Sequence, residues 1–308
     1  MMFIFRMLIK TFIAGILFTS VSWAIAADQT LKPFILAYKA KGDLASVAKE
    51  VRQKLETNGF EIAGVYSPYD TASIIIITSE ELKKAAGQSK FGGYGAGQRV
   101  SITKVGDEIQ VAYTNPAYMA KAYRMNDDLL KVTEQLNKAL GKETEFGPKE
   151  GLTGKELHKY HYMFGMEYFD EPSILAKYDN YEQAVQAVEK GLAAGKGGVT
   201  KVYRIDIPGQ QQTVFGVHMT DDCSGDKFIM DKIDFKPLRS TAHLPYEMLV
   251  AGNTVYALYA RFRIAINFPD LKMMGANSFF KIMCAPGAIE RALTLAAGGD
   301  TKKTPANF

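Results

Sequence analysis

The sequence has little of the material from which most enzyme and metal sites are built. Its 308 residues include four histidines, two cysteines and one tryptophan. It contains no Cys-x-x-Cys pair, no Gly-x-Ser-x-Gly elbow, no His-Glu-x-x-His helix and no Gly-Lys-Ser/Thr phosphate loop. These absences exclude the common signatures of thiol redox chemistry, serine hydrolysis, zinc proteolysis and nucleotide binding. The sequence therefore favours a non-catalytic protein over an enzyme.

A strong excess of one charge and a long internal apolar run are also missing. Lys and Arg total 37 against 33 Asp and Glu, which gives a formal net charge of +4. The basic residues are spread along the chain and form no stripe of the kind that neutralises phosphates. Beyond the N-terminus, no apolar run reaches the roughly 18 residues of a membrane-spanning helix. We expect neither a nucleic-acid partner nor an integral membrane protein.

The N-terminal 26 residues are typical of a secretory signal peptide. Arg6 and Lys10 supply positive charge, residues 11–23 are largely apolar, and Ala24-Ile25-Ala26 has the small-residue pattern of a cleavage site. We expect residues 1–26 to be a signal peptide that is cleaved near Ala26. The protein would then be periplasmic or secreted. In such a compartment an even cysteine count favours a disulfide between Cys223 and Cys284, and two buried free thiols are the alternative.

The remaining chain carries the same pattern twice, with the second copy 137 residues after the first. Both copies have apolar residues at helical spacing, followed by glycine and then a Val-Tyr pair. The matching positions are Leu44 and Tyr181, Val51 and Val188, Leu55 and Leu192, and Tyr66 and Tyr203. We expect two tandem repeats at 32–141 and 173–297, a connector at 142–172 and a disordered tail at 298–308.

Each repeat reads as strand, helix, two strands, hairpin and helix. The first helix follows Asp43, a residue type that caps helices, and the hairpins turn at Gly106-Asp107 and Gly252-Asn253. Asn126 is expected to cap the closing helix of the first repeat, and the glycine-rich stretch 92–97 is expected to be a mobile connection. The order predicts an α+β fold in which helices pack on one face of a sheet.

The first repeat resembles a bacterial and archaeal family, domain of unknown function 302. The resemblance lies in Lys54-Leu-Glu-Thr-Asn-Gly-Phe60, in the apolar strand that follows, and in Val111-Ala-Tyr-Thr-Asn-Pro116 before a terminal helix. The second repeat keeps Tyr259 but has Ala-Arg-Phe in place of Thr-Asn-Pro. The resemblance implies a small α+β fold, with no established activity and no catalytic residue to carry across.

Three clusters are candidate sites. Tyr113, Asn115 and Tyr118 of the first repeat, with Arg261 and Arg263 of the second, are expected to line a groove between the repeats that binds a small molecule or a periplasmic protein. His158, His161, Met163 and Met166 combine imidazoles on one helix face with thioethers, a ligand set that suits copper or a haem iron. An aromatic connector with histidines at its rim is the alternative for this segment. Cys223 beside His218, Asp221 and Asp222 could ligate zinc or act as a nucleophile, but only without a disulfide.

Overall fold

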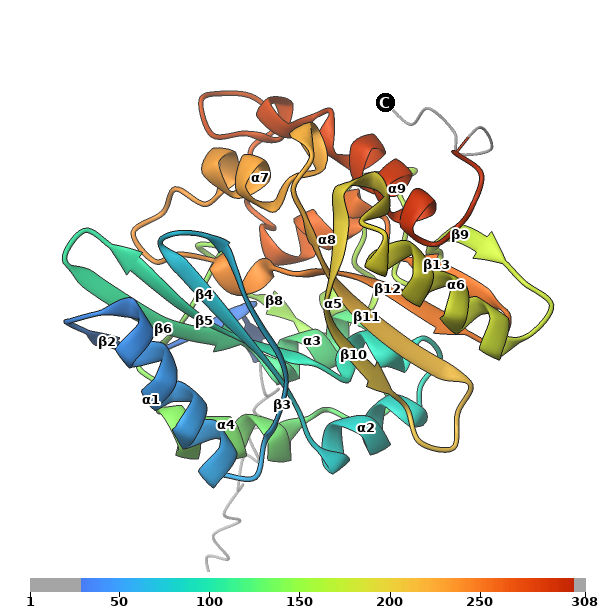
Figure 1. Ribbon diagram of the computed structural model, residues 1–308. Coiled ribbons are helices and arrows are strands. Elements are labelled where there is room, and N and C mark those ends of the chain that lie inside the picture. The colour runs from blue at the N-terminus through green and yellow to red at the C-terminus, as the bar shows by residue number, and fades with distance from the viewer. Residues whose placement is uncertain (1–28, 302–308) are drawn as a thin grey trace, which may run out of the picture.

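The computed structural model describes residues 29–301. The expected signal peptide 1–26 lies outside these residues, as does most of the expected tail. Within 29–301, no helix combines the length and the apolar character needed to cross a membrane. The chain folds into two units that lie side by side, each built on an antiparallel sheet, with β3 and β10 meeting in the middle (Figure 1).

The first sheet has the strand order β3-β4-β5-β6-β2-β7. Its strands are β2 (Phe34–Ala40), β3 (Glu61–Tyr69), β4 (Ala72–Thr78), β5 (Gln98–Val105), β6 (Glu108–Thr114) and β7 (Thr144–Phe146). Strand β7 pairs with β2 through Phe34 and Phe146. The sheet therefore extends past residue 141, into the segment expected to be the connector. A short separate ladder joins β1 (Thr30–Leu31) to β8 (Leu152–Thr153).

The second sheet has the order β10-β11-β12-β13-β9. Its strands are β9 (Ser173–Lys177), β10 (Val199–Asp206), β11 (Gln212–Met219), β12 (Tyr246–Ala251) and β13 (Thr254–Ala257). Counted from the edge strands β10 and β3, the two sheets have the same order. Strands β10, β11, β12, β13 and β9 correspond to β3, β4, β5, β6 and β2. The α+β class is confirmed, and an origin of the two units by duplication stays a prediction.

Helices follow the strands in the same sequence in both units. The first unit contains α1 (Leu44–Thr57), α2 (Glu80–Gly87), α3 (Pro116–Ala122) and α4 (Leu130–Leu140), and α5 (Gly154–His158) follows it. The second contains α6 (Tyr181–Ala193), α7 (Asp226–Ile233), α8 (Ala260–Asn267) and α9 (Ala285–Ala296). Short 3-10 turns are η1 (Gly92–Gly95), η2 (Lys196–Gly198), η3 (Asp222–Ser224), η4 (Thr241–His243) and η5 (Phe279–Ile282).

The caps agree with the sequence at one helix and differ at another. The Asp43 side chain accepts the backbone N–H of Ser46 and so caps α1. Asn126 does not cap α4, because Leu129 occupies the N-cap position and the Asn126 amide donates instead to the Gln88 carbonyl. Asn126 therefore fixes the chain before α4 to the end of α2.

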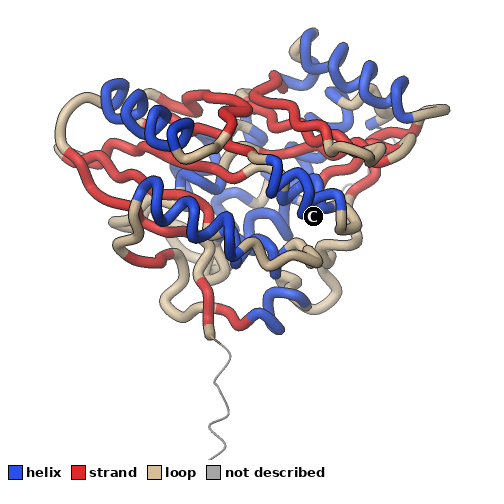
Figure 2. Tube along the Cα trace, turned by 90° about the horizontal axis from the view of Figure 1, so that it is seen from below, coloured by secondary structure: helices blue, strands red, loops and turns tan. Residues whose placement is uncertain are grey.

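The apolar core explains why this sequence forms these elements. Val47, Val51 and Leu55 form the buried stripe of α1, as their helical spacing predicts. Ile74 to Ile77 of β4 are each at most 1% exposed, so both faces of that strand are covered. Figure 2 shows the strands of the two units as a band across the molecule, with helices packed on it.

The second face of the first sheet is covered by a segment of the other unit. Phe34, Leu36, Ala112 and Phe146 form a small cluster with Ala242 of η4, apart from the cluster that faces α1. On the same segment, the Thr241 hydroxyl accepts a hydrogen bond from Thr103 of β5 at 2.9 Å. The second unit thus reaches across the junction and closes the core of the first.

The first unit in turn packs on the second through the glycine-rich stretch. Residues 92–97 are buried, so the expectation of a mobile connection is wrong. The Gly93 N–H donates to Gln212 at 3.3 Å, and a Cβ at Gly93 would lie 2.5 Å from Leu249 Cδ1. Gly64 of β3 likewise lies against the Val202 carbonyl of β10, where a Cβ would approach to 2.5 Å. Glycine permits these close approaches between the units because it lacks a side chain.

Candidate functional site: a cavity beside the junction of the two units

The groove residues expected in the first unit are all buried and take part in packing. The Tyr113 hydroxyl bonds to Asn137 Oδ1 at 2.6 Å and to the Gly141 carbonyl at 2.9 Å, at the end of α4. The Asn115 amide donates to the Lys32 carbonyl at 3.0 Å. The Tyr118 hydroxyl donates to the Ile266 carbonyl of α8 at 2.7 Å, which ties the two units together.

The two arginines expected to face these residues also have partners in the fold. Arg261 forms an ion pair with Glu167 of the connector. Arg263 is 1% exposed, and its guanidinium lies 3.4 Å from Glu247 Oε2. The structure therefore does not gather the five predicted groove residues around one opening, and none of the five is in the walls of the two cavities described below.

A buried charge cluster joins the two sheets where the groove was expected. Glu247 of β12 forms ion pairs with Arg263 of α8 and with Arg99 of β5, and both guanidiniums are about 1% exposed. Burial, then Arg263 and Arg99, hold the pKa of His243 well below its usual range. Neutral His243 accepts from Arg263 Nη1 at Nδ1 (3.0 Å) and lies 3.1 Å from the Tyr246 hydroxyl through Nε2. Two arginines and one carboxylate thus form a structural connection between the units.

The predicted metal ligands are spread over a helix end and a loop. His158 is the last residue of α5 and His161 lies beyond it, so the expectation that they share one helix face is wrong. His161 Nδ1 is 2.7 Å from the Met163 carbonyl, and its ring packs on Tyr168. Among residues 29–301, no three His, Cys, Asp or Glu side chains gather as a metal centre would require. Copper or haem binding through His158, His161, Met163 and Met166 stays a prediction.

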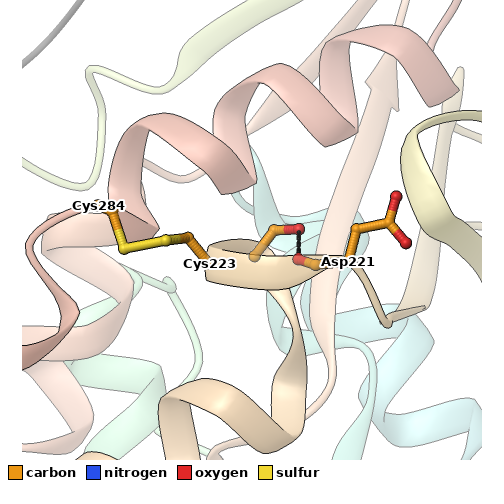
Figure 3. Close-up of a disulfide and its surroundings, with 4 residues drawn as sticks. Asp221, Cys223 and Cys284 are labelled. Carbon is orange, nitrogen blue, oxygen red and sulfur yellow. Dashed lines mark hydrogen bonds between the residues drawn. A yellow bond between two sulfur atoms is a disulfide. The ribbon is translucent and has the colours of Figure 1, made fainter.

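The two cysteines form a disulfide, as the even count favoured. Cys223 in η3 is bonded to Cys284 at the start of α9, and the Ser224 hydroxyl donates to the Asp221 carbonyl beside it (Figure 3). A thiolate nucleophile or zinc ligand at Cys223 is therefore excluded in this form of the protein. His218 lies 4.0 Å from the buried carboxylate of Asp226.

A cavity of about 410 Å³, here called the Asn267 cavity, lies where the ends of α7 and α8 meet the start of the connector. Gly147 borders it from the connector side, and Ile233, Phe268 and Leu271 give it an apolar lining. Small-molecule sites are typically concave, mainly apolar and equipped with a few fixed polar groups. This cavity has that composition.

Asn267 is a buried polar residue in the wall of this cavity. Its side chain is 1% exposed, and its Nδ2 donates to the Arg263 carbonyl at 3.0 Å. A carbonyl can only accept, so this bond orients the amide and leaves Oδ1 as the remaining acceptor. That oxygen is buried without a hydrogen-bond partner. Leaving a buried acceptor unpaired costs about 1–3 kcal/mol. Because this oxygen has almost no accessible surface, a molecule in the cavity does not reach it while the side chain keeps this position.

A second cavity, here called the inter-unit cleft, adjoins the first. It has a volume of about 530 Å³ and is bordered by Tyr69 and Lys104 of the first unit and by Lys227 and Arg239 of the second. Residues 234 and 235 contribute to the walls of both cavities. This cleft lies between the units, but it is not the predicted groove, because none of the five predicted residues lines it.

Asp234 is the titratable group shared by the two cavities. Its Oδ1 accepts the Ser240 N–H at 2.8 Å, whereas its Oδ2 has only a long contact of 3.5 Å with the Thr241 hydroxyl. Burial raises the pKa of Asp234 to about 6, and the Ser240 hydrogen bond and Arg239 oppose that rise. The carboxylate thus has spare acceptor capacity on one oxygen.

Sequence reasoning missed both residues. Asn267 ends the run Ile264-Ala-Ile266, and a polar residue closing an apolar helical stretch is the one signal that pointed to it. Asp234 follows Ile233 in a segment whose position depends on contacts with the other unit, through Thr241 and Thr103. No motif or spacing marks it.

No family model, curated protein or solved structure is significantly similar to this chain. Membership of family 302 accordingly stays a prediction.

Proposed function

We propose that this protein acts by binding a small, largely apolar molecule in the Asn267 cavity, as an exported, non-catalytic binding protein. The observation that carries the proposal is the cavity itself, a space of about 410 Å³ with an apolar lining from Ile233, Phe268 and Leu271. The disulfide between Cys223 and Cys284 supports export, since such bonds persist in oxidising compartments. The proposed site lies beside the junction of the two units and contains none of Tyr113, Asn115, Tyr118, Arg261 and Arg263.

The cavity can be blocked from its mouth without disturbing the core. Ala276 borders the cavity and is exposed, so Ala276→Trp places an indole in the opening. Ala45 is an exposed alanine on α1 that borders neither cavity, and Ala45→Trp is the matched control. Three probes share a phenyl body and differ in the polar head: 2-phenylethylamine, 2-phenylethanol and 3-phenylpropanoate.

We expect at least one probe to raise the melting temperature of the wild type, because a ligand at 100 times its Kd stabilises the native state by about 2.7 kcal/mol. Ala276→Trp should abolish the shift and Ala45→Trp should keep it. Thermal unfolding followed by circular dichroism gives the measurement. The proposal fails if no probe shifts the wild type, or if the shift survives in Ala276→Trp.

A further inference from the structure

We infer that the open edge of β9 binds an extended segment of a partner protein as an added antiparallel strand. The segment carries an apolar side chain over Ile174 and a basic side chain toward Glu290. This surface shares no wall residue with the Asn267 cavity, so it goes beyond the proposed function and is tested independently of it. The inference is based on a difference between two corresponding sheet edges.

Strands β2 and β9 correspond in position and in local geometry. Each pairs with the second strand of a hairpin, β6 or β13, in an antiparallel ladder that contains one register shift. The shift occurs at Ala37 in β2 and at Leu175 in β9. Ile174, just before the shift, is therefore the counterpart of Leu36.

The outer edge of β2 is occupied, whereas that of β9 is open. In the first sheet, β7 pairs antiparallel with β2, and Thr144 lies opposite Leu36. In the second sheet β9 is the outermost strand, and within residues 29–301 no strand pairs with its other edge (Figure 1). Leu36 is 1% exposed, whereas Ile174 is 56% exposed. An open edge presents backbone N–H and C=O groups with which another chain can pair.

The chain after α9 does not follow the course of the chain after α4. After α4, the Glu143 N–H donates to the Leu36 carbonyl at 2.8 Å, and the chain enters β7. After α9, Gly299 lies so close to the Leu175 carbonyl that a Cβ would not fit. Thr301, two residues further along, belongs to no strand. The edge that precedes Leu175 is thus left to another chain.

A groove beside this edge indicates the chemistry of the added strand. The groove has a volume of about 510 Å³, and its walls carry two carboxylates, Glu290 and Asp300, and one ammonium group, Lys177. The Ser173 hydroxyl donates to Glu290, so Glu290 lies on the face of the sheet to which Ser173 points. In an antiparallel pair, the residue directly opposite Ser173 shares that face. A Lys or Arg at this position meets Glu290, and its two neighbours lie on the face of Ile174.

The probe is a fluorescein-labelled peptide, Thr-Ser-Val-Lys-Phe-Ser-Thr, whose binding to the full-length protein is followed by fluorescence anisotropy. Its Val is placed opposite Ile174 and its Lys opposite Ser173, and its Phe has the position of Phe146 in β7. Two controls carry backbone N-methyl groups, one at Lys and the other at both Val and Phe. Because alternate residues of a strand direct their N–H groups to opposite edges, one control should bind at least tenfold more weakly and the other about as well as the parent.

Protein variants test the two side-chain contacts. Ile174→Thr should weaken binding about threefold, as expected for the loss of one cross-strand apolar contact. Val65→Thr is the matched control, because Val65 is 47% exposed on β3 and does not border the groove. Glu290→Gln should also weaken binding about threefold, the size expected for an exposed ion pair, and should not affect a peptide with Thr in place of Lys. Circular dichroism establishes that each variant is folded.

Hydrogen exchange and sedimentation identify the occupant of the edge. The outward backbone amides of β9 should exchange rapidly in the free protein and slowly once the peptide is bound. Protection of these amides in a free monomer would mean that the chain's own residues occupy the edge. A free dimer that Ile174→Thr weakens would mean that a second copy does. Either result overturns the inference, as does the absence of peptide binding or equal binding of both N-methylated controls.

Discussion

The two units share a strand order but differ in one connecting segment, which lies between β4 and β5 in the first unit and between β11 and β12 in the second. In the first unit, residues 79–97 form α2 and η1, and the glycine-rich end is buried against the second sheet. In the second unit, residues 220–245 contain η3, α7 and η4, carry a disulfide and reach the first sheet through Thr241. Each segment packs on the other unit.

The two segments differ in how closely they pack on the other unit, and this difference determines where a cavity is left. Gly93 allows the first segment to approach β12 so closely that a Cβ would lie 2.5 Å from Leu249 Cδ1. The second segment is longer and leaves the Asn267 cavity and the inter-unit cleft beside residues 234 and 235. Binding residues lie disproportionately on loops that a rigid scaffold positions. The first segment therefore packs tightly at the junction of the two units, whereas the second segment borders the candidate site.

The largest effect is expected where the two units share a buried charge. Glu247→Gln removes the carboxylate and leaves Arg99 and Arg263 buried without compensation. Breaking a buried ion pair in this way costs about 3–5 kcal/mol, and we expect that loss in the free energy of unfolding measured with urea. Glu189→Gln is the control, because Glu189 pairs with Lys201 and Arg204 near the surface and should cost at most about 1 kcal/mol. Equal losses in the two variants would show that the buried cluster does not hold the units together.

How much could be predicted from the sequence depends on how local the cause is. The helix α1 follows from Asp43 as its cap and from the spacing of Val47, Val51 and Leu55, all within one segment. The burial of β4 follows from four consecutive isoleucines. The strand order of each sheet was consistent with the repeated element order, since hairpins place neighbouring strands side by side.

The parts that could not be predicted depend on contacts between distant residues. The glycines at 92–97 favoured a mobile loop because glycine is flexible in isolation, whereas packing against Leu249 and Gln212 determines their conformation. Tyr118 and Arg263 are predicted as ligand contacts from their positions near the ends of strands in the two repeats. Their partners, Ile266 and Glu247, lie far away in the sequence and use those polar groups within the fold.

The next effect concerns the disulfide, which joins Cys223 of the second segment to Cys284 at the start of α9. Cys223 and Cys284 are 61 residues apart, and closing a loop of that length stabilises a protein by about 4 kcal/mol in the chain-entropy model, with typical measured values of about 2–4 kcal/mol. We expect Cys223→Ala/Cys284→Ala to lose that amount in urea unfolding. Adding a reductant should lower the stability of the wild type and leave the double variant unchanged. A wild type that is insensitive to reductant would show that the bond does not stabilise the segment.

The smallest effect tests the close approach in the first segment. Gly93→Ala places a methyl group against Leu249, which is itself buried, so the side chain must shift at a cost of about 1–2 kcal/mol. Gly154→Ala is the control, since a Cβ there would meet only Lys121 carbons at 3.7 Å and should change stability by at most about 0.5 kcal/mol. Urea unfolding of both variants gives the comparison. If Gly93→Ala is as stable as Gly154→Ala, the first segment has room to spare, and the contrast with the cavity-bearing second segment must come from chain length alone.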